Sequence, residues 1–401
     1  MFRQLQQRSE NPIKVGLVGA GCMGLGIAHQ VANTTGMELT WVTDSQIGNA
    51  AKAAALADDC LHSDDTLKLI VEHPVDVFVE STNSIWSAFL YCQQAIKNKA
   101  HVVLMNAEVD LVFGTQLQAL AKENNVVVTS DAGDQHGVLA TMIDEIQLWG
   151  FDIVQAGNIK GFLNRYATAE DLIEEAAKRN LNPIQCCAYT DGTKLNIEMA
   201  LLANAYGLTP TQIGMTGPQI SDVKDAMDSF DLDSIPKNGS IDYLLGAEPG
   251  GGVYVIGRSE DNFQQPYLNY YKIGEGPYYL FSRPYHLCHL ETTTAIAKAA
   301  IQNEAILQPW QGRIADVYAF AKSDIVAETP IPHGIGGDHF YGLVASAEEA
   351  DTKGWIPIAL LDGETESALT RSNISKDQPL TWDHIHPISD PMIRQFHTIQ
   401  K

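Results

Sequence analysis

The sequence lacks any apolar run of about 18 residues, the length that a membrane-spanning helix needs. Apolar residues make up 45 % of the chain and charged residues only 19 %, which excludes a disordered chain of low hydrophobicity. Residues 1–10 contain no apolar stretch ahead of a small-residue cleavage site, so we expect no secretory signal. The composition therefore predicts a soluble globular protein without a membrane partner.

Basic residues are scarce in this chain. Lys and Arg together number 26 against 49 Asp and Glu, which gives a formal net charge of −23. Such a charge repels phosphodiester backbones, so we expect no nucleic-acid partner. A small anionic substrate stays compatible with this charge where a few cationic side chains converge in one pocket.

The six cysteines are scattered, and none forms the CxxC spacing of a metal site. A bridge between the adjacent Cys186 and Cys187 would be strained, so a reducing compartment is the simpler interpretation and we predict a cytoplasmic protein. The other cysteines are Cys22, Cys60, Cys92 and Cys288.

A length of 401 residues is too great for one ordinary core and predicts two or three domains. Residues 1–150 alternate short apolar segments with helical ones, as in βαβ units, which predicts an α/β domain with a doubly wound parallel sheet. The expected strands are 14–18, 38–43, 75–80, 101–105 and 126–129, and the expected helices are 24–33, 48–57, 66–72, 84–98, 115–123 and 138–148.

A different pattern begins after residue 150. Residues 151–307 predict an α+β domain for catalysis and subunit association, and residues 308–401, where Gly and Pro interrupt every apolar run, predict a small, mostly β module. In the second domain we expect strands at 152–159, 184–189, 253–257 and 278–283, helices at 169–179 and 194–205, and long loops at 231–240 and 247–252.

A glycine-rich turn joins the first expected strand to the first expected helix. Gly19, Gly21 and Gly24 form the pattern G-x-G-x-x-G, with Cys22 and Met23 between the last two. The first glycine permits a tight turn, the second lets a pyrophosphate approach the backbone, and the third lets helix and strand pack closely. The pattern predicts a Rossmann domain that binds NAD or NADP at a helix N-terminus, and a glycine-rich turn of some other α/β protein is the alternative.

Asp44 ends the second expected strand, twenty residues after Gly24. A carboxylate at this place accepts hydrogen bonds from the adenosine ribose, which favours NAD over NADP. The next residues, Ser45 and Gln46, offer no cation for a 2′-phosphate. The other role open to Asp44 is to cap the following helix.

Polar residues also follow later strands of the expected sheet. Ser81, Thr82 and Asn106 lie at its carboxyl edge, where open α/β sheets bind their ligands, so we expect them to border the nicotinamide. Such residues are also ordinary turn formers, and that alternative stays open for each.

Two segments of the second domain, 156–166 and 191–200, are dense in glycine, amide and cationic residues. Lys194 and Glu198 lie four residues apart on an expected helix, so they share one face and can serve a common site. An exposed helical salt bridge is the alternative interpretation.

These segments are similar to homoserine dehydrogenases, because Gly157, Gly161 and Asn164 resemble the G-x-x-x-G-x-x-N segment of that family. A closer resemblance is to homoserine dehydrogenase-like oxidoreductases with a C-terminal SAF domain, the group that includes the 1-deoxy-xylulose-5-phosphate reductoisomerase-like enzymes. The resemblance covers nearly the whole chain and is carried by residues 191–194, 198–200, 203–208, 274–278, 283–287, 290–291, 335–337 and 379–383.

The resemblance implies hydride transfer at a carbonyl or alcohol carbon, in a cleft between the first two domains, and an SAF-like fold for residues 308–401. By motif position, Lys160, Lys194 and His286 supply cations to an anionic or phosphorylated substrate and to the developing alkoxide. Asp191 and Glu198 are expected to hold the two lysines. The residues assigned to substrate binding are Asn164, Arg165, Asp134 and Arg283.

One departure from the family concerns a metal. Where the reductoisomerase-like members have an acidic Asp-Glu pair, this chain has Asp134, Gln135 and His136. Mg²⁺ prefers anionic oxygen ligands, so we expect no metal and favour simple oxidation or reduction over rearrangement of a carbon skeleton. Homoserine itself is disfavoured as a substrate, because 106–108 lack the lysine usual in those enzymes.

Three functions stay open from the sequence. The first is an oxidoreductase acting on a small polar substrate, anionic or sugar-derived; the second is a sugar-phosphate reductoisomerase; the third is a non-catalytic nucleotide- or carbohydrate-binding protein. Convergence of Lys160, Lys194 and His286 near the nicotinamide would favour catalysis, and their scatter would favour binding. The open sheet of the second domain predicts a homo-oligomer, a dimer or tetramer.

Overall fold

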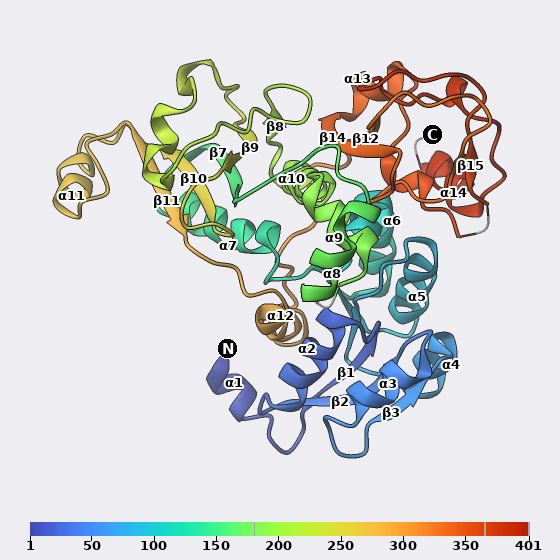
Figure 1. The fold of residues 1–401 in the computed structure, drawn as a ribbon. Coiled ribbons are helices and arrows are strands. Elements are labelled where there is room, and N and C mark those ends of the chain that lie inside the picture. Colours follow the sequence, from blue (N-terminus) through green and yellow to red (C-terminus); the bar gives the residue numbers. More distant parts are fainter. Residues whose placement is uncertain (180, 365, 400–401) are drawn as a thin grey trace.

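The computed structural model describes residues 1–179, 181–364 and 366–399 (Figure 1). We refer to the expected domains 1–150, 151–307 and 308 onward as the N-terminal, central and C-terminal parts. One apolar core runs through all three parts and includes Leu17, Leu195 and Val317. No helix among the described residues is long and apolar enough to cross a membrane.

The N-terminal part contains a six-stranded parallel sheet in the order β3-β2-β1-β4-β5-β6, which confirms the expected Rossmann fold. The strand order reverses between β1 and β4, where open α/β sheets bind ligands at their carboxyl edge. The strands are β1 (Ile13–Val18), β2 (Met37–Thr43), β3 (Leu61–Ser63), β4 (Val77–Glu80), β5 (His101–Leu104) and β6 (Val128–Ser130).

Helices connect these strands and bury their apolar faces against the sheet. Strand β4 is buried at every position, as a parallel strand covered on both faces must be. The helices are α1 (Phe2–Gln6), α2 (Cys22–Ala32), α3 (Ile47–Ala54), α4 (Thr66–Glu72), α5 (Trp86–Lys97), α6 (Ala107–Asn124) and α7 (Gln135–Leu148).

The central part is built on a five-stranded mixed sheet in the order β11-β10-β7-β9-β8. Strand β10 is antiparallel to both neighbours, whereas β9 is parallel to β7 and β8. The bounds are β7 (Asp152–Lys160), β8 (Thr209–Pro210), β9 (Ser240–Leu245), β10 (Val253–Arg258), β11 (Tyr278–Arg283), α8 (Ile173–Arg179), α9 (Pro183–Thr190), α10 (Thr193–Tyr206), α11 (Gln265–Tyr270) and α12 (Cys288–Ala297).

The helices of the central part place it against its neighbours. Helix α7 packs on β7 and β10, α10 lies between the sheet and the C-terminal part, and α12 packs against α2 (Figure 1). The segment around α11 extends away from the body (Figure 1). It exposes aromatic side chains, among them Phe263, Tyr270 and Tyr271.

The C-terminal part contains two antiparallel strand pairs and short helices. Strands β12 and β14 pair with each other and pack on α10, while β13 pairs with β15. Its assignment as an SAF domain stays a prediction. The elements are β12 (Ala315–Ala321), β13 (Pro330–Ile331), β14 (Phe340–Ser346), β15 (Ala368–Leu369), α13 (Ala347–Thr352) and α14 (Pro391–Ile399).

One predicted strand is wrong. Residues 184–189 lie in helix α9, because the Asn182 side chain caps its N-terminus and Pro183 occupies its first turn. Two predictions were incomplete. Helix α6 begins at Ala107 rather than near residue 115, and strand β9 directly follows the expected loop 231–240.

Candidate active site

The glycine turn at the start of α2 leaves its backbone open. Gly19 has φ +85°, and a Cβ there would lie 2.6 Å from the Ser81 carbonyl oxygen. A Cβ on Gly24 would lie 1.8 Å from the Gly19 carbonyl oxygen, so both positions require glycine. A Cβ on Gly21 would meet no atom within 4 Å. The turn is therefore rigid on the protein side and bare on the outer side, which fits a pyrophosphate on the helix N-terminus.

The Asp44 side chain turns toward this loop. Its carboxylate accepts hydrogen bonds from the Ala20 N–H at 2.7 Å and from the Gln46 N–H at 2.8 Å. Each carboxylate oxygen keeps a further lone pair, so a ribose hydroxyl can also be bound. Cys22 is exposed and Met23 half-buried in the first turn of α2.

The expected nicotinamide-side residues are tied into the sheet edge. The Ser81 hydroxyl donates to the Gly19 carbonyl at 2.7 Å, and the Thr82 N–H donates to Glu80 at 2.9 Å. Burial, opposed by bonds from Thr82, raises the pKa of Glu80 to about 7. The Asn106 side chain caps α6, accepting from two backbone N–H groups at 3.1 Å, and donates to Ser84 at 2.6 Å. The Asn106 side chain is thus engaged in the turn, which is the alternative role that the sequence left open for it.

Lys160, at the end of β7, belongs to a nearly buried polar network. Its ammonium donates to Gln135 Oε1 at 2.5 Å and to Glu198 Oε2 at 3.4 Å. Asn158 on the same strand donates to Glu198 Oε2 at 2.5 Å. The Lys160 and Glu198 side chains are only 20 % and 10 % exposed. Glu198 therefore contacts the Lys160 ammonium, and its role in orienting this lysine stays a prediction.

The Glu198 carboxylate lies at the electrostatic centre of this region. Burial by itself raises the pKa of Glu198, but neighbouring basic groups outweigh burial and hold the pKa below its ordinary value. These groups are Lys160, His136, His286 and Lys194. Of these groups Lys160 contacts Glu198 directly, whereas Lys194 and His286 act on it electrostatically and bond to other partners.

Lys194 pairs with a residue that the sequence argument missed. Its ammonium binds Glu108 in the first turn of α6, and the two side chains are 20 % and 8 % exposed. Burial acts to lower the pKa of Lys194, but Glu108 and Tyr189 more than offset it and raise the pKa above its usual value. The expectation that Asp191 or Glu198 holds Lys194 is corrected here, because Glu108 reaches the ammonium from the neighbouring part of the molecule.

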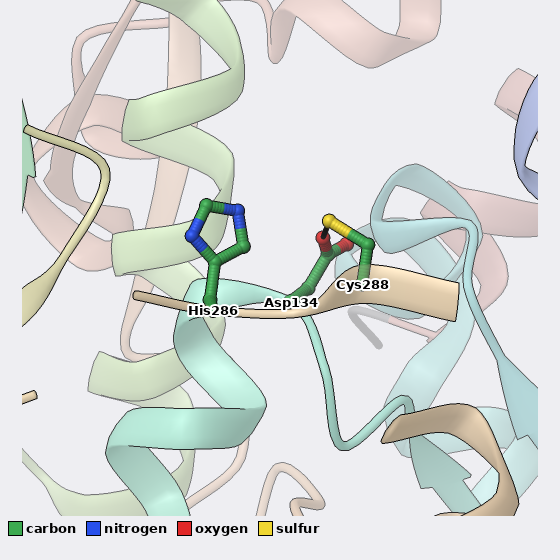
Figure 2. A group of neighbouring side chains, drawn as sticks. All are labelled: Asp134, His286 and Cys288. Atoms are coloured by element: carbon green, nitrogen blue, oxygen red, sulfur yellow. Dashed lines mark hydrogen bonds between the residues drawn. The ribbon is translucent and has the colours of Figure 1, made fainter. Parts of the chain in front are cut away.

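Asp134, His286 and Cys288 form a second group beside this network (Figure 2). Asp134 precedes α7, His286 lies just before α12, and Cys288 is the first residue of α12. The Cys288 thiol donates to Asp134 Oδ1 at 3.7 Å, and His286 Nδ1 lies 2.6 Å from the Gly251 carbonyl oxygen. Burial raises the pKa of Asp134 and, with the charge of Asp134, that of the Cys288 thiol.

Other predicted residues lie outside the network. Asp191 is ion-paired with the buried Lys322 at 2.9 Å and holds neither predicted lysine, because its carboxylate faces the C-terminal part. Arg165 is exposed and stacks over the Tyr341 ring at 5.2 Å. The Asn164 side chain accepts from a backbone N–H at 3.2 Å, and Arg283 is paired with Glu291 at 2.5 Å.

Four residues of the site were missed as site residues: Glu108, Gln135, Asn158 and Cys288. Gln135 directly follows the predicted Asp134, and Asn158 lies two residues before the predicted Lys160, which is the signal available for them. Nothing in the spacing of Cys288 or Glu108 relates them to their partners, since Glu108 and Lys194 are 86 residues apart.

A cavity of about 670 Å³ lies elsewhere, between α6, α13 and α14. Asp110, Asn204, Arg313 and Phe396 are among its lining residues, and none of the lining residues belongs to the network of Lys160 and Glu198. The Arg313 guanidinium there is already bound by Asp316 and Asp351, each at 2.6 Å. The cavity is thus separate from the group of predicted catalytic side chains.

Known families and structures resemble this chain. Residues 16–130 match the NAD-binding domain family of homoserine dehydrogenase, and residues 133–292 match the catalytic domain family of oxidoreductase DRL. The homoserine dehydrogenase of Bacillus subtilis is 27 % identical over 137 residues, and that of Neisseria gonorrhoeae is 25 % identical over 134 residues. The match spans 31 % of the length of each enzyme and 31 % and 32 % of this chain.

A solved structure extends the likeness to most of the chain. The homoserine dehydrogenase from Thiobacillus denitrificans is 14 % identical, with a TM-score of 0.51 over 91 % of this chain and 97 % of that one. At this identity the likeness concerns the fold.

Proposed function

Because this chain is a homoserine dehydrogenase-like NAD(P)-dependent oxidoreductase, we propose that it transfers a hydride to or from a carbonyl or alcohol carbon of a small polar substrate, anionic or sugar-derived. The observation that carries the proposal is a pair of nearly buried lysines held beside the nucleotide domain, since Lys160 binds Gln135 and Glu198, and Lys194 binds Glu108. A protein that only binds nucleotides has no need to bury two ammonium groups with their partners at this place.

The turn from Gly19 to Gly24 and the carboxylate of Asp44 would hold the nucleotide. The dinucleotide supplies or accepts the hydride when bound. The open outer side of Gly21 suits the pyrophosphate, and Asp44 facing the turn favours NAD.

The two lysines would act on the substrate oxygen. An ammonium beside this oxygen stabilises the negative charge that develops during reduction and delivers the proton that completes the alcohol. Glu198 holds Lys160, and Glu108 holds Lys194 and keeps it charged. The same cations would attract a carboxylate or phosphate of the substrate into a protein that is otherwise strongly acidic.

We place the reaction in the cytoplasm, because the six cysteines are all free thiols, three of them buried. We also propose a homo-oligomer, a dimer or tetramer, since the exposed aromatic segment around α11 is suited to bury itself against a second copy.

Nucleotide titration followed by a substrate screen tests this function. We expect NADH binding to quench the protein fluorescence or to increase the fluorescence of NADH. In the substrate screen, we expect at least one class of compound to change the nicotinamide absorbance. The classes are hydroxy acids, homoserine, sugar acids and sugar phosphates, with 1-deoxy-xylulose 5-phosphate among the last. Lys194→Met should abolish turnover and keep nucleotide affinity, whereas Lys224→Met, at a lysine that is 83 % exposed, should change neither. A wild-type protein that binds neither NADH nor NADPH contradicts the proposal.

A further inference from the structure

We propose that Asp134, His286 and Cys288 form a binding site for a zinc-class divalent cation. One oxygen, one ring nitrogen and one sulfur of these side chains all lie within 4.8 Å of one another. A tetrahedral zinc ion bound to such atoms sets them roughly 3.3–3.5 Å apart. The Cys288 sulfur and Asp134 Oδ1 are already 3.7 Å apart. Small side-chain rotations therefore complete the ligand set.

The His286 ring is oriented as a metal-binding imidazole requires. Its Nδ1 lies 2.6 Å from the Gly251 carbonyl oxygen, so Nδ1 carries the proton and the lone pair is on Nε2. In Figure 2 the ring turns Nε2 toward the side on which the Asp134 carboxylate and the Cys288 sulfur lie. Metal-bound histidines characteristically donate their other ring N–H to a backbone carbonyl or carboxylate.

The backbone holds the other two donors in place. Asp134 precedes α7, yet its carboxylate makes no capping bond to that helix and stays available. The Cys288 N–H donates to the Gly133 carbonyl oxygen at 3.0 Å, and Gly133 has no room for a Cβ, which would lie 2.0 Å from the Cys288 carbonyl oxygen. Cys288 has φ +27°, a conformation that residues other than glycine rarely adopt and that is typical of functional positions.

The donor types select the metal. A thiolate and a carboxylate balance the charge of a divalent ion, and a thiolate with an imidazole suits zinc or a similar borderline metal, not Mg²⁺. The sequence argument against a metal considered CxxC spacing and a magnesium site, and it had no means of placing Cys288 beside Asp134.

Three protein ligands leave one coordination position open, as in catalytic zinc sites. On the proposed function, this position would take the reacting oxygen of the substrate, because Gln135, which binds the Lys160 ammonium, follows Asp134 in the chain and its amide shares the Gly251 carbonyl with His286. The metal would then share with the lysines the stabilisation of charge on that oxygen.

Cobalt(II) binding tests the site without substrate or nucleotide. Chelator-treated full-length protein is titrated with CoCl2, and we expect one cobalt per chain with a thiolate-to-cobalt absorption band in the near ultraviolet. Cys288→Ser should remove this band, and Asp134→Asn and His286→Gln should each weaken binding by about tenfold or more. Cys60→Ser, which changes a half-buried cysteine outside the group, should bind cobalt like the wild type.

Circular dichroism and Tm of each variant separate loss of the site from loss of the fold. A wild type without the thiolate band, or a folded Cys288→Ser variant that keeps it, overturns the proposal. Nucleotide titration and turnover are measured on the same samples. Cobalt binding without turnover supports the metal site and refutes the proposed function. Turnover by metal-free protein that binds no cobalt supports the proposed function and refutes the metal site.

Discussion

Replacing Glu108 by Gln isolates the ion pair that links the N-terminal part to Lys194. The two side chains are 8 % and 20 % exposed, so a protein-like effective dielectric of about 20 applies, and two charges about 4 Å apart then interact with about 4 kcal/mol. Loss of this interaction corresponds to a fall of about 3 units in the pKa of Lys194. We also expect the free energy of unfolding to fall by about 3–5 kcal/mol, because the variant leaves a buried cation without its partner.

The pH profile of kcat for carbonyl reduction reports this change. In the proposed function protonated Lys194 is the active form, so activity should be lost as pH rises through its pKa. In the wild type Glu108 raises that pKa, and the alkaline loss lies beyond the assayable range. In Glu108→Gln the loss should move down by about 3 pH units. Glu260→Gln, which breaks the exposed pair with Arg258, should change neither the profile nor stability by more than about 0.5 kcal/mol. A Glu108→Gln profile that superimposes on that of the wild type refutes the assignment.

Four further changes test other parts of the molecule. Gly21→Val should weaken NADH binding about tenfold or more with little change in Tm, because its side chain enters open space, and unchanged affinity contradicts the turn as the pyrophosphate site. Asp44→Ala should weaken NADH more than NADPH, and equal losses in two parallel titrations count against ribose recognition. The free energy of unfolding should fall by about 3 kcal/mol as pH rises from 4.5 to 7, because Glu80 has a pKa of about 7 in the folded protein and ionises at lower pH in the unfolded chain. Urea unfolding at several pH values measures this fall, and Glu80→Gln should reduce it. A pH dependence in Glu80→Gln equal to that of the wild type contradicts the assignment. Tyr270→Glu, at a 77 % exposed position, should dissociate the oligomer in light scattering, and a monomeric wild type refutes the proposed assembly.

The features that local physical rules govern were predictable from the sequence. The turn of Gly19, Gly21 and Gly24 needs glycine because of contacts within one strand–turn–helix unit, and the parallel sheet follows from alternating apolar segments. Helix α4 begins and ends at the predicted residues, since Asp65 caps its N-terminus through a local side-chain bond.

The features that depend on distant contacts were not predictable. Residues 184–189 are an exception, because the Asn182 cap and Pro183 in the first turn of α9 are local helix signals that the strand prediction overlooked. Helical spacing correctly placed Lys194 and Glu198 on one face, yet it said nothing of Glu108, which arrives from α6 and takes the ammonium. Asp191 has the right charge and sequence neighbourhood for the site, but Lys322 of the C-terminal part binds it.

The site belongs to no single part of the chain. Glu108 and Gln135 come from helices of the N-terminal part, whereas Lys194 and Lys160 come from the central part, so each lysine is held by a side chain across the boundary. Both contacts lie at helix N-termini beyond the carboxyl edge of the parallel sheet, where the nucleotide is expected. A relative movement of the two parts would separate Lys194 from Glu108, and it costs several kcal/mol where either charge stays buried without its partner. The ion pair that keeps Lys194 charged therefore also resists such a movement, so the protonation of this lysine and the closeness of the two parts are set by the same contact.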